Sequence, residues 1–338
     1  MKVLYLHPYR GTNLGDNFTL EGSKYLMTKA IGPHDMMMVN LSEVEGNPEI
    51  VFKKYVKEDI DVFVVSGTPW IWDCCTTSKK YKALTNLLEI YKNKKKIAMG
   101  IGSCYAINAN VLAQQIYGGH KKEFIKELHE VWCKFDLIFT RDTMASKILE
   151  FADVKHFDEI CTSCHLKNCI EIPEKKKETL PALIFYNPEL GLSRESLDKY
   201  FVEDYIFFQL RFIKEYSPEI YTIEPMEYEW LKSHGINAER IADIKRLIEI
   251  LNNSRFILSG RIHSAIPARM LGKDVFLMPV DSRYLTTTKL GIIPIFTQGL
   301  PYIDFENLKN RKLDVDKIAH DSEVRITQQI RLLFEKCK

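Results

Sequence analysis

Arg261 and His263 are the residues whose types and spacing are best suited to chemistry. They lie one position apart in the segment Ser259-Gly260-Arg261-Ile262-His263-Ser264. The planar guanidinium of an arginine binds a phosphate or a carboxylate through two parallel hydrogen bonds. A histidine changes charge near neutral pH and is therefore suited to proton transfer. Such a pair is also common in solvated loops, so its interpretation depends on the elements around it and on other parts of the chain.

The flanking sequence predicts a strand, a helix and a second strand. Residues 256–258 and 275–278 are short apolar runs, and residues 264–271 between them are typical of a helix that ends before Gly272. Strand, helix and strand over so few residues predict a parallel βαβ unit. Arg261 and His263 are then expected at the carboxyl end of a strand, just before a helix N-terminus. Open α/β sheets bind ligands at this edge, and a helix N-terminus favours anions.

The first half of the chain contains four apolar runs that are each followed by polar residues or glycines, as in the Arg261 segment. Residues 3–6, 62–65, 97–99 and 137–139 are continuous apolar runs, typical of parallel strands that are covered on both faces. Polar residues or glycines follow each run, and the candidate binding residues among them are Asn13, Asp16, Gly67, Gly100, Gly102 and Arg141. Tight βα turns also need glycine for purely structural reasons. Together with the Arg261 segment, these positions predict one binding site along the carboxyl ends of the strands.

Length and composition favour two α/β domains. The 338 residues are 46% hydrophobic and 27% charged, and the net charge of +2 gives no reason to expect a nucleic-acid partner. The charged, proline-bounded stretch 171–181 is the predicted boundary, which gives domains 1–172 and 182–338. An amphipathic helix is predicted at 324–334 and could pack back on the first domain. No apolar run has the length of a membrane span, and the N-terminus enters a strand directly, so a cytoplasmic location is expected.

Eight cysteines at irregular positions predict reduced thiols more than a disulfide framework. Cys161, Cys164 and His165 match the Cys-x-x-Cys-His pattern of haem attachment, but no export signal or axial partner accompanies them. With Cys169 they also supply ligand types for a structural zinc site. Free thiols are the favoured interpretation. No metal is expected in the active site, because arginines and a histidine supply charge stabilisation and proton transfer and no carboxylate cluster indicates a magnesium site.

These motifs resemble those of the polysaccharide pyruvyl transferase family. Its opening loop motif is similar to Gly11, Asn13, Gly15 and Asp16 of this sequence, and its glycine motif to Gly100-Ile101-Gly102. Its Arg-Asp pair after a strand looks like Arg141-Asp142. The most diagnostic similarity is the segment 259–264, followed by Ala268, Gly272 and the region of Asp281. Two positions depart from the family: Ser66-Gly67-Thr68-Pro69 replaces a glycine-rich stretch, and Arg283 stands where a lysine is frequent.

The resemblance implies a glycosyltransferase-B-like fold, with two Rossmann-like domains facing across a cleft. It also implies transfer of the pyruvyl group of phosphoenolpyruvate, without a cofactor, onto two hydroxyls of a sugar-containing acceptor as a ketal. Arg261 and Arg141, from different domains, would hold the donor, and His263 would be the general acid. Neighbouring arginines would lower the pKa of His263 and a bound phosphate would raise it. Asn13 and Asp16 would orient acceptor hydroxyls or cap the first helix, and Asp281 and Arg283 complete the expected substrate contacts.

Two other functions remain as alternatives. A nucleotide-sugar-dependent glycosyltransferase has the same two-domain fold, because fold alone does not define chemistry. A non-catalytic protein that binds sugars or anions is the second alternative, and the altered 66–69 segment supports it. Release of phosphate from phosphoenolpyruvate, with and without sugar acceptors, distinguishes the three.

Overall fold

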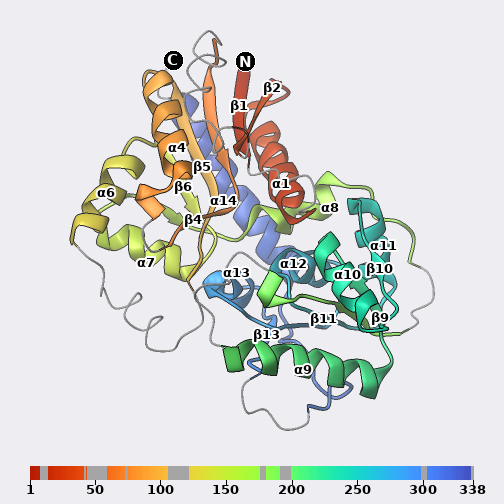
Figure 1. Ribbon diagram of the computed structural model, residues 1–338. Coiled ribbons are helices and arrows are strands. Elements are labelled where there is room, and N and C mark those ends of the chain that lie inside the picture. The colour runs from red at the N-terminus through yellow and green to blue at the C-terminus, as the bar shows by residue number, and fades with distance from the viewer. Residues whose placement is uncertain are drawn as a thin grey trace.

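The computed structural model describes residues 1–7, 14–41, 43, 59–72, 75–105, 122–175, 180–190, 199–297 and 303–335. Two parallel sheets organise it, and helices lie on their faces (Figure 1). The first sheet has the strand order β2-β1-β3-β5-β6-β7, with β4 paired to β5. Its strands are β1 (Lys2–His7), β2 (Asp35–Asn40), β3 (Val62–Ser66), β4 (Pro69–Ile71), β5 (Lys95–Ser103), β6 (Leu137–Thr140) and β7 (Phe157–Asp158).

The second sheet has the strand order β10-β9-β8-β11-β12-β13. Its strands are β8 (Ala182–Ile184), β9 (Glu219–Thr222), β10 (Glu239–Arg240), β11 (Ile257–Ser259), β12 (Val275–Leu277) and β13 (Ile293–Pro294). The strands predicted at 256–258 and 275–278 are β11 and β12, which pair in parallel with Ile257 opposite Val275. The predicted βαβ unit is therefore present.

Helices cover both sheets. The α-helices are α1 (Leu14–Ile31), α4 (Lys79–Ile90), α6 (Lys122–Trp132), α7 (Thr143–Phe151), α8 (Leu166–Cys169), α9 (Lys199–Tyr216), α10 (Pro225–Ser233), α11 (Ile244–Asn253), α12 (Ile262–Met270), α13 (Leu285–Thr288) and α14 (Val315–Glu335). The 3-10 helices are η1 (Cys75–Thr77), η2 (Thr162–His165), η3 (Pro188–Leu190) and η4 (Ser282–Tyr284). Among the described residues, no helix is both long and apolar enough to cross a membrane.

The continuous apolar runs form strands because each sheet is covered on both faces. In β1, Leu4 and Leu6 enter one apolar core, whereas Val3 and Tyr5 enter the core on the opposite face. Alternate side chains of β8 and β11 are divided between two cores in the same way. A strand in this position needs apolar residues at every position, which explains the absence of polar alternation.

The last helix, α14, joins the two halves of the molecule. Val315 and Ala319, near its start, belong to a core of the second sheet, whereas Ile326 and Ile330 pack with Val3 and other residues of the first. Figure 1 shows this helix, coloured blue, among elements of the N-terminal half. The prediction of a helix at 324–334 was wrong at its start, because α14 begins at Val315. Its first turns bury mainly small or polar side chains, which weakens the apolar periodicity.

Candidate active site

The turn after β11 presents Arg261 and His263 at the carboxyl edge of the second sheet. The Ser259 hydroxyl accepts a hydrogen bond from the Arg261 amide at 3.0 Å and donates one to the Arg261 carbonyl at 2.9 Å, which closes the turn. Gly260 permits it, because a Cβ at this position would lie 2.4 Å from the Cβ of Tyr186. His263 is the second residue of α12. The local sequence therefore places both side chains where the expected site lies.

His263 contacts the first half of the chain. A Cβ on Gly15, in the first turn of α1, would lie 2.3 Å from Nδ1 of His263. On the other side of the ring, Arg141 Nη1 donates to His263 Nε2 at 3.4 Å. Because an arginine only donates, Nε2 accepts, and the proton of the neutral imidazole lies on Nδ1. The structure thus brings together two expected site residues, Arg141 and His263, and the motif glycine Gly15 from separate parts of the sequence.

Arg141 follows β6 and is completely buried. Gly102 of β5 makes room for it, since a Cβ there would lie 2.4 Å from Arg141 Nε. Within the described part of the chain, Arg141 Nε and Nη2 have no hydrogen-bond partner. A buried cation without a hydrogen-bonded counter-ion is costly. The arrangement therefore provides two aligned donors for an anion.

Asp142, the second residue of the Arg-Asp motif, has a structural role. Its carboxylate caps α7 by accepting from the Ala145 amide at 2.8 Å. It also accepts from the Ser103 amide and hydroxyl, each at 2.9 Å. Burial raises the pKa of Asp142, although these hydrogen bonds and the charge of Arg141 oppose the shift. The motif thus combines one residue for the site with one that anchors the adjoining helix.

Arg261 has a carboxylate partner that the sequence did not reveal. Its Nη2 donates to Glu227 Oε1 at 2.7 Å, and its Nη1 lies 3.9 Å from Glu224. The guanidinium lies over the Tyr186 ring, 4.9 Å from the ring centroid. Glu227 is 1% exposed, and burial raises its pKa against the effect of Arg261. Because the fork of Arg261 already faces glutamates, Arg141 has more unused donors than Arg261.

Asp281 and Arg283 form a second ion pair beside His263. Arg283 donates to both Asp281 oxygens, with Nε to Oδ1 at 2.7 Å and Nη2 to Oδ2 at 2.5 Å. Between them, Ser282 links this turn to the first sheet: its amide donates to the Tyr105 carbonyl at 2.7 Å and its hydroxyl lies 2.8 Å from that of Ser103. The expected pair is thus held rigidly at the junction between the two sheets.

The electrostatic environment keeps the imidazole of His263 neutral. Burial lowers the pKa of His263 well below its usual range, and the charges of Arg141, Arg283 and Arg261 lower it further. Glu227 and Asp281 balance two of these arginines, whereas Arg141 has no hydrogen-bonded carboxylate among the described residues. The site is therefore positive and suited to an anion, whose charge would raise the pKa of His263.

Other expected binding residues lie differently. A Cβ on Gly67 would lie 2.4 Å from Thr19 Oγ1, and Gly100 faces Thr162; both have positive φ angles of 64° and 68°. We therefore assign both glycines to backbone geometry and packing. Asp16 is buried in the first turn of α1. Asn13 lies outside the described residues, so its expected role stays a prediction.

The sequence analysis did not predict an unusual backbone conformation shortly after β3. Thr68 has a φ of 64°, which is an outlier for a β-branched residue. Its carbonyl accepts from the Gly102 amide at 3.4 Å, next to Arg141. Strained residues of this kind concentrate at functional sites. The segment that departs from the family pattern thus lies directly beside the expected site.

The cysteine motif forms part of the packing. Cys161 and Cys164 are buried in an apolar core, and the Cys169 thiol donates to the His165 carbonyl at 3.1 Å. Across the residues that the structure describes, no group of three or more His, Cys, Asp or Glu side chains is arranged to hold a metal ion. The zinc alternative therefore finds no support in these side chains.

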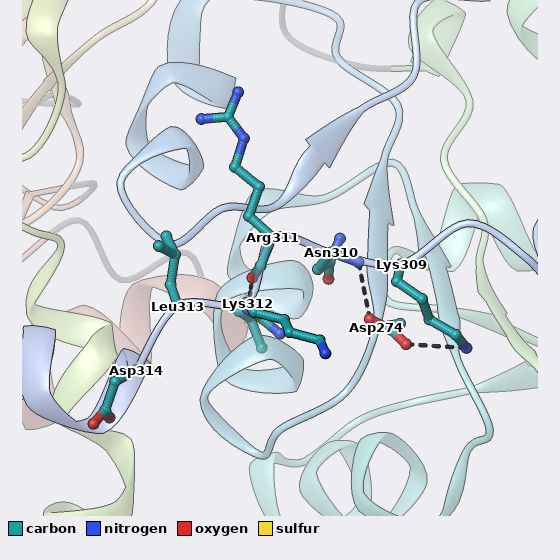
Figure 2. Close-up of a pocket in the computed structure, with 8 residues that line it drawn as sticks. Asp274, Lys309, Asn310, Arg311, Lys312, Leu313 and Asp314 are labelled. Carbon is teal, nitrogen blue, oxygen red and sulfur yellow. Dashed lines mark hydrogen bonds and ion pairs between the residues drawn. The ribbon is translucent and has the colours of Figure 1, made fainter.

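A pocket of about 500 Å³ lies at the opposite edge of the second sheet (Figure 2). Its wall includes Arg269, at the C-terminal end of α12, and Asp274, just before β12. Arg269 is bonded to the carbonyls of Leu290 and Arg311, and Asp274 lies 3.4 Å from Lys309 Nζ. The polar groups of this pocket thus hold neighbouring segments in place, and none belongs to the His263 site.

The two parallel sheets, each covered by helices, and the charged site at their junction define a protein of the glycosyltransferase-B-like class. Similar solved structures are S. aureus MnaA in a co-structure with UDP (13% identity, TM-score 0.52, 98% of this chain and 90% of that chain) and a putative UDP-N-acetylglucosamine 2-epimerase from Listeria monocytogenes (11%, 0.51, 97% and 90%). Another is the UDP-GlcNAc 2-epimerase of Methanocaldococcus jannaschii (12%, 0.50, 97% and 99%). At these identities the similarity establishes the fold alone, and the predicted fold class is confirmed.

Residues 13–282 match the family model for polysaccharide pyruvyl transferase. The chain belongs to this family, as its motifs predicted, and is therefore a transferase by family. A search of curated proteins found no match.

Proposed function

We propose that the protein transfers the pyruvyl group of phosphoenolpyruvate onto two hydroxyls of a sugar as a ketal. The observation that carries the proposal is the buried guanidinium of Arg141, with Nε and Nη2 unpartnered within the described residues and Nη1 against His263. Phosphoenolpyruvate bears a phosphate and a carboxylate, and either group fits two parallel N–H donors. Arg261 and Arg283 add positive charge around the same imidazole.

The reaction needs one acid–base group. A proton added to the methylene carbon of the donor turns it into a methyl group and leaves positive charge on the central carbon, which a sugar hydroxyl attacks. Phosphate then leaves, and a second hydroxyl completes the ketal. The two sugar hydroxyls lose one proton each. One of these protons replaces the proton that was added to form the methyl group, and the other leaves with phosphate. His263 gives the first proton and regains one from the attacking hydroxyl.

The low pKa of His263 makes this step depend on the donor. In the free site the imidazole is neutral and has no proton to give from Nε2. A donor anion that binds Arg141 neutralises part of the positive potential at His263 and therefore raises the pKa of His263. Proton uptake is then coupled to donor binding, which limits protonation of His263 to the occupied site.

The proposal is tested by phosphate release from phosphoenolpyruvate, with and without methyl glycosides of hexoses and N-acetylhexosamines. We expect acceptor-dependent release and a pyruvyl ketal in the product by mass spectrometry. A chelator should have no effect, because guanidiniums supply the charge stabilisation. Glycosyl transfer from a nucleotide sugar, with no release from phosphoenolpyruvate, would contradict the proposal and favour the glycosyltransferase alternative.

A further inference from the structure

The Arg261–Glu227 ion pair uses only part of its hydrogen-bonding capacity. Arg261 Nη2 donates to Glu227 Oε1 at 2.7 Å. Among the described residues, Nε of the same guanidinium and Oε2 of the same carboxylate have no partner, although both atoms are buried. Native proteins leave few buried polar atoms unpaired, so two on one ion pair need an explanation.

Asn187 contributes a third such atom. Its amide N–H donates to Glu227 Oε1 at 3.3 Å, so it lies against the same carboxylate. Its side-chain Oδ1 accepts from the Glu189 amide at 2.9 Å, whereas Nδ2 has no partner in the described structure. Asn187 is completely buried and follows β8, which is the neighbour of β11 in the sheet. It therefore stands next to the turn that carries Arg261.

The three unused atoms are complementary to the hydrogen-bonding groups of one hydroxyl. Arg261 Nε and Asn187 Nδ2 are donors, and Glu227 Oε2 is an acceptor. A hydroxyl accepts two hydrogen bonds and donates one. A phosphate or carboxylate oxygen accepts from both donors but gives nothing to Oε2, and its charge is repelled by Glu227. An ammonium group can donate to Glu227 Oε2 but cannot accept a hydrogen bond from either donor.

We infer that Asn187, Glu227 and Arg261 bind one hydroxyl group of the acceptor sugar beside the donor site. This inference rests on the proposed function, and it assigns Arg261 to both substrates: its charge to the donor and its Nε to the acceptor. Phosphoenolpyruvate has no hydroxyl, so the group comes from the acceptor. The guanidinium of Arg261 also lies over the Tyr186 ring, 4.9 Å from the ring centroid, so the two groups pack together beside Nε.

The test is the variant Asn187→Ser, which keeps an oxygen to accept from the Glu189 amide and removes the Nδ2 donor. With saturating phosphoenolpyruvate, we expect the KM for the best methyl glycoside to rise roughly 3- to 10-fold, the usual worth of one neutral hydrogen bond. The donor Kd, measured by calorimetry, should stay unchanged. The matched control is Asn252→Ser, because Asn252 is buried in the same half of the molecule and its amide already bonds to the Pro173 carbonyl. This control should leave the KM for the glycoside unchanged.

Monodeoxy versions of the same glycoside identify the hydroxyl. One monodeoxy glycoside should bind the wild-type protein more weakly than the parent glycoside does. Asn187→Ser should bind this monodeoxy glycoside no more weakly than the wild-type protein does, because both changes remove the same contact. If Asn187→Ser lowers the melting temperature and leaves the glycoside KM unchanged, the three atoms hold a structural water and the inference is wrong.

Failure of the proposed function would be recognised separately. If the wild-type protein releases no phosphate from phosphoenolpyruvate, the same glycosides are titrated by calorimetry against wild type and Asn187→Ser. Weaker binding to Asn187→Ser would support the hydroxyl site on its own. Absence of glycoside binding to the wild-type protein would overturn it.

Discussion

At the scale of single residues, the proposed anion binding depends most on Arg141. It is fully buried, and among the described residues the only hydrogen-bond partner of its guanidinium is the neutral His263. Its position therefore costs stability in the free protein, and binding of an anion recovers part of that cost. Selection for stability alone would favour an apolar side chain here.

Arg141→Met tests this directly. We expect the variant to raise the free energy of unfolding of the free protein by about 1–4 kcal/mol, because an apolar side chain replaces a buried unpaired charge. Binding of phosphoenolpyruvate should weaken by about 2–5 kcal/mol, the typical cost of losing a desolvated charged contact. Urea unfolding and calorimetry measure the two effects. A destabilised variant with unchanged donor affinity would show that Arg141 is a structural residue.

His263→Gln should instead lower turnover. We expect kcat to fall roughly 10²- to 10⁴-fold, the usual worth of a positioned acid, with donor affinity nearly intact. Glutamine retains an oxygen that can accept from Arg141, so the fold should be preserved. Full turnover in this variant would exclude the proposed acid, and a joint loss of turnover and melting temperature would indicate a packing role.

The low pKa of His263 gives a second measurable result. At pH 7 the free imidazole is neutral, because burial and three arginines hold its pKa far below neutrality. Donor binding should therefore take up a fraction of a proton, and the measured binding enthalpy should vary with the ionisation enthalpy of the buffer. His263→Gln should abolish this variation. Equal uptake in wild type and variant would assign the proton to another group.

Residue types and spacing predicted part of this site. Arg141 and Arg261 lie just after apolar strands and His263 lies at the start of the next helix, and a strand end is a local feature that sequence reveals. Glu227 was missed because α10 and the position before it contain three glutamates, Glu224, Glu227 and Glu229. Only tertiary packing buries the middle one against Arg261. Asn187 was missed for the same reason, since its significance lies in atoms left unpaired by its neighbours.

At the scale of elements, η2 shows that the spacing of a motif does not reveal its tertiary contacts. The Cys-x-x-Cys-His pattern is typical of haem or metal binding, but η2 packs against α1 and α14. His165 is 1% exposed, and its ring centroid lies 6.1 Å from that of Tyr25. Neither ring nitrogen has a hydrogen-bond partner within the described residues. The contacts that bury it come from distant parts of the chain, and no local pattern encodes them.

The buried His165 makes stability depend on pH. Burial lowers its pKa to about 4, although Glu323 and Glu159 oppose this shift. Below pH 6.5 the unfolded chain gains a proton that the folded chain does not accept until about pH 4, so stability falls as the pH decreases across this range. The total loss is about 3 kcal/mol, from a cost of about 1.4 kcal/mol per pKa unit.

His165→Leu should remove this contribution. We expect its free energy of unfolding to decrease less between pH 6.5 and 4 than that of the wild-type protein, by about 3 kcal/mol. Urea unfolding at several pH values provides the measurement, and the exposed His320→Gln is the control. If both variants retain the wild-type pH dependence, His165 is protonated in the folded state and the argument from burial is wrong.

At the scale of the whole molecule, the cores do not follow the order of the sequence. Leu14 and Phe18 of α1 pack into a core of the second sheet, whereas Ile326 and Ile330 of α14 pack into a core of the first. The amphipathic helix predicted at 324–334 was expected to be able to pack back on the first domain, whereas no pattern indicated a partner for α1, because several surfaces of similar character are available to an amphipathic helix. This exchange connects the two halves of the molecule.

Polar contacts fix α14 at the same junction. Arg325 donates to both oxygens of the buried Glu159 at 2.7 and 2.8 Å, and the Ser322 hydroxyl donates to Glu159 at 2.7 Å. Tyr25 of α1 donates to Glu323 at 2.8 Å. A helix from the end of the chain is therefore part of the framework that holds α1, and with it Gly15, against His263.

Ile330→Ala tests whether α14 stabilises the first half of the molecule. Ile330 is completely buried with Val3 and Tyr5, so its truncation should lower the free energy of unfolding by about 2–5 kcal/mol. Val324→Ala on the same helix is the control, because Val324 is 48% exposed and its loss should change stability by less than about 0.5 kcal/mol. Hydrogen exchange should show the additional opening in α1 and β1, which contact this face of α14, and much less in β12. Equal loss of protection in both sheets would mean that the halves unfold as one unit, and no loss in α1 would mean that α14 is peripheral to the first core.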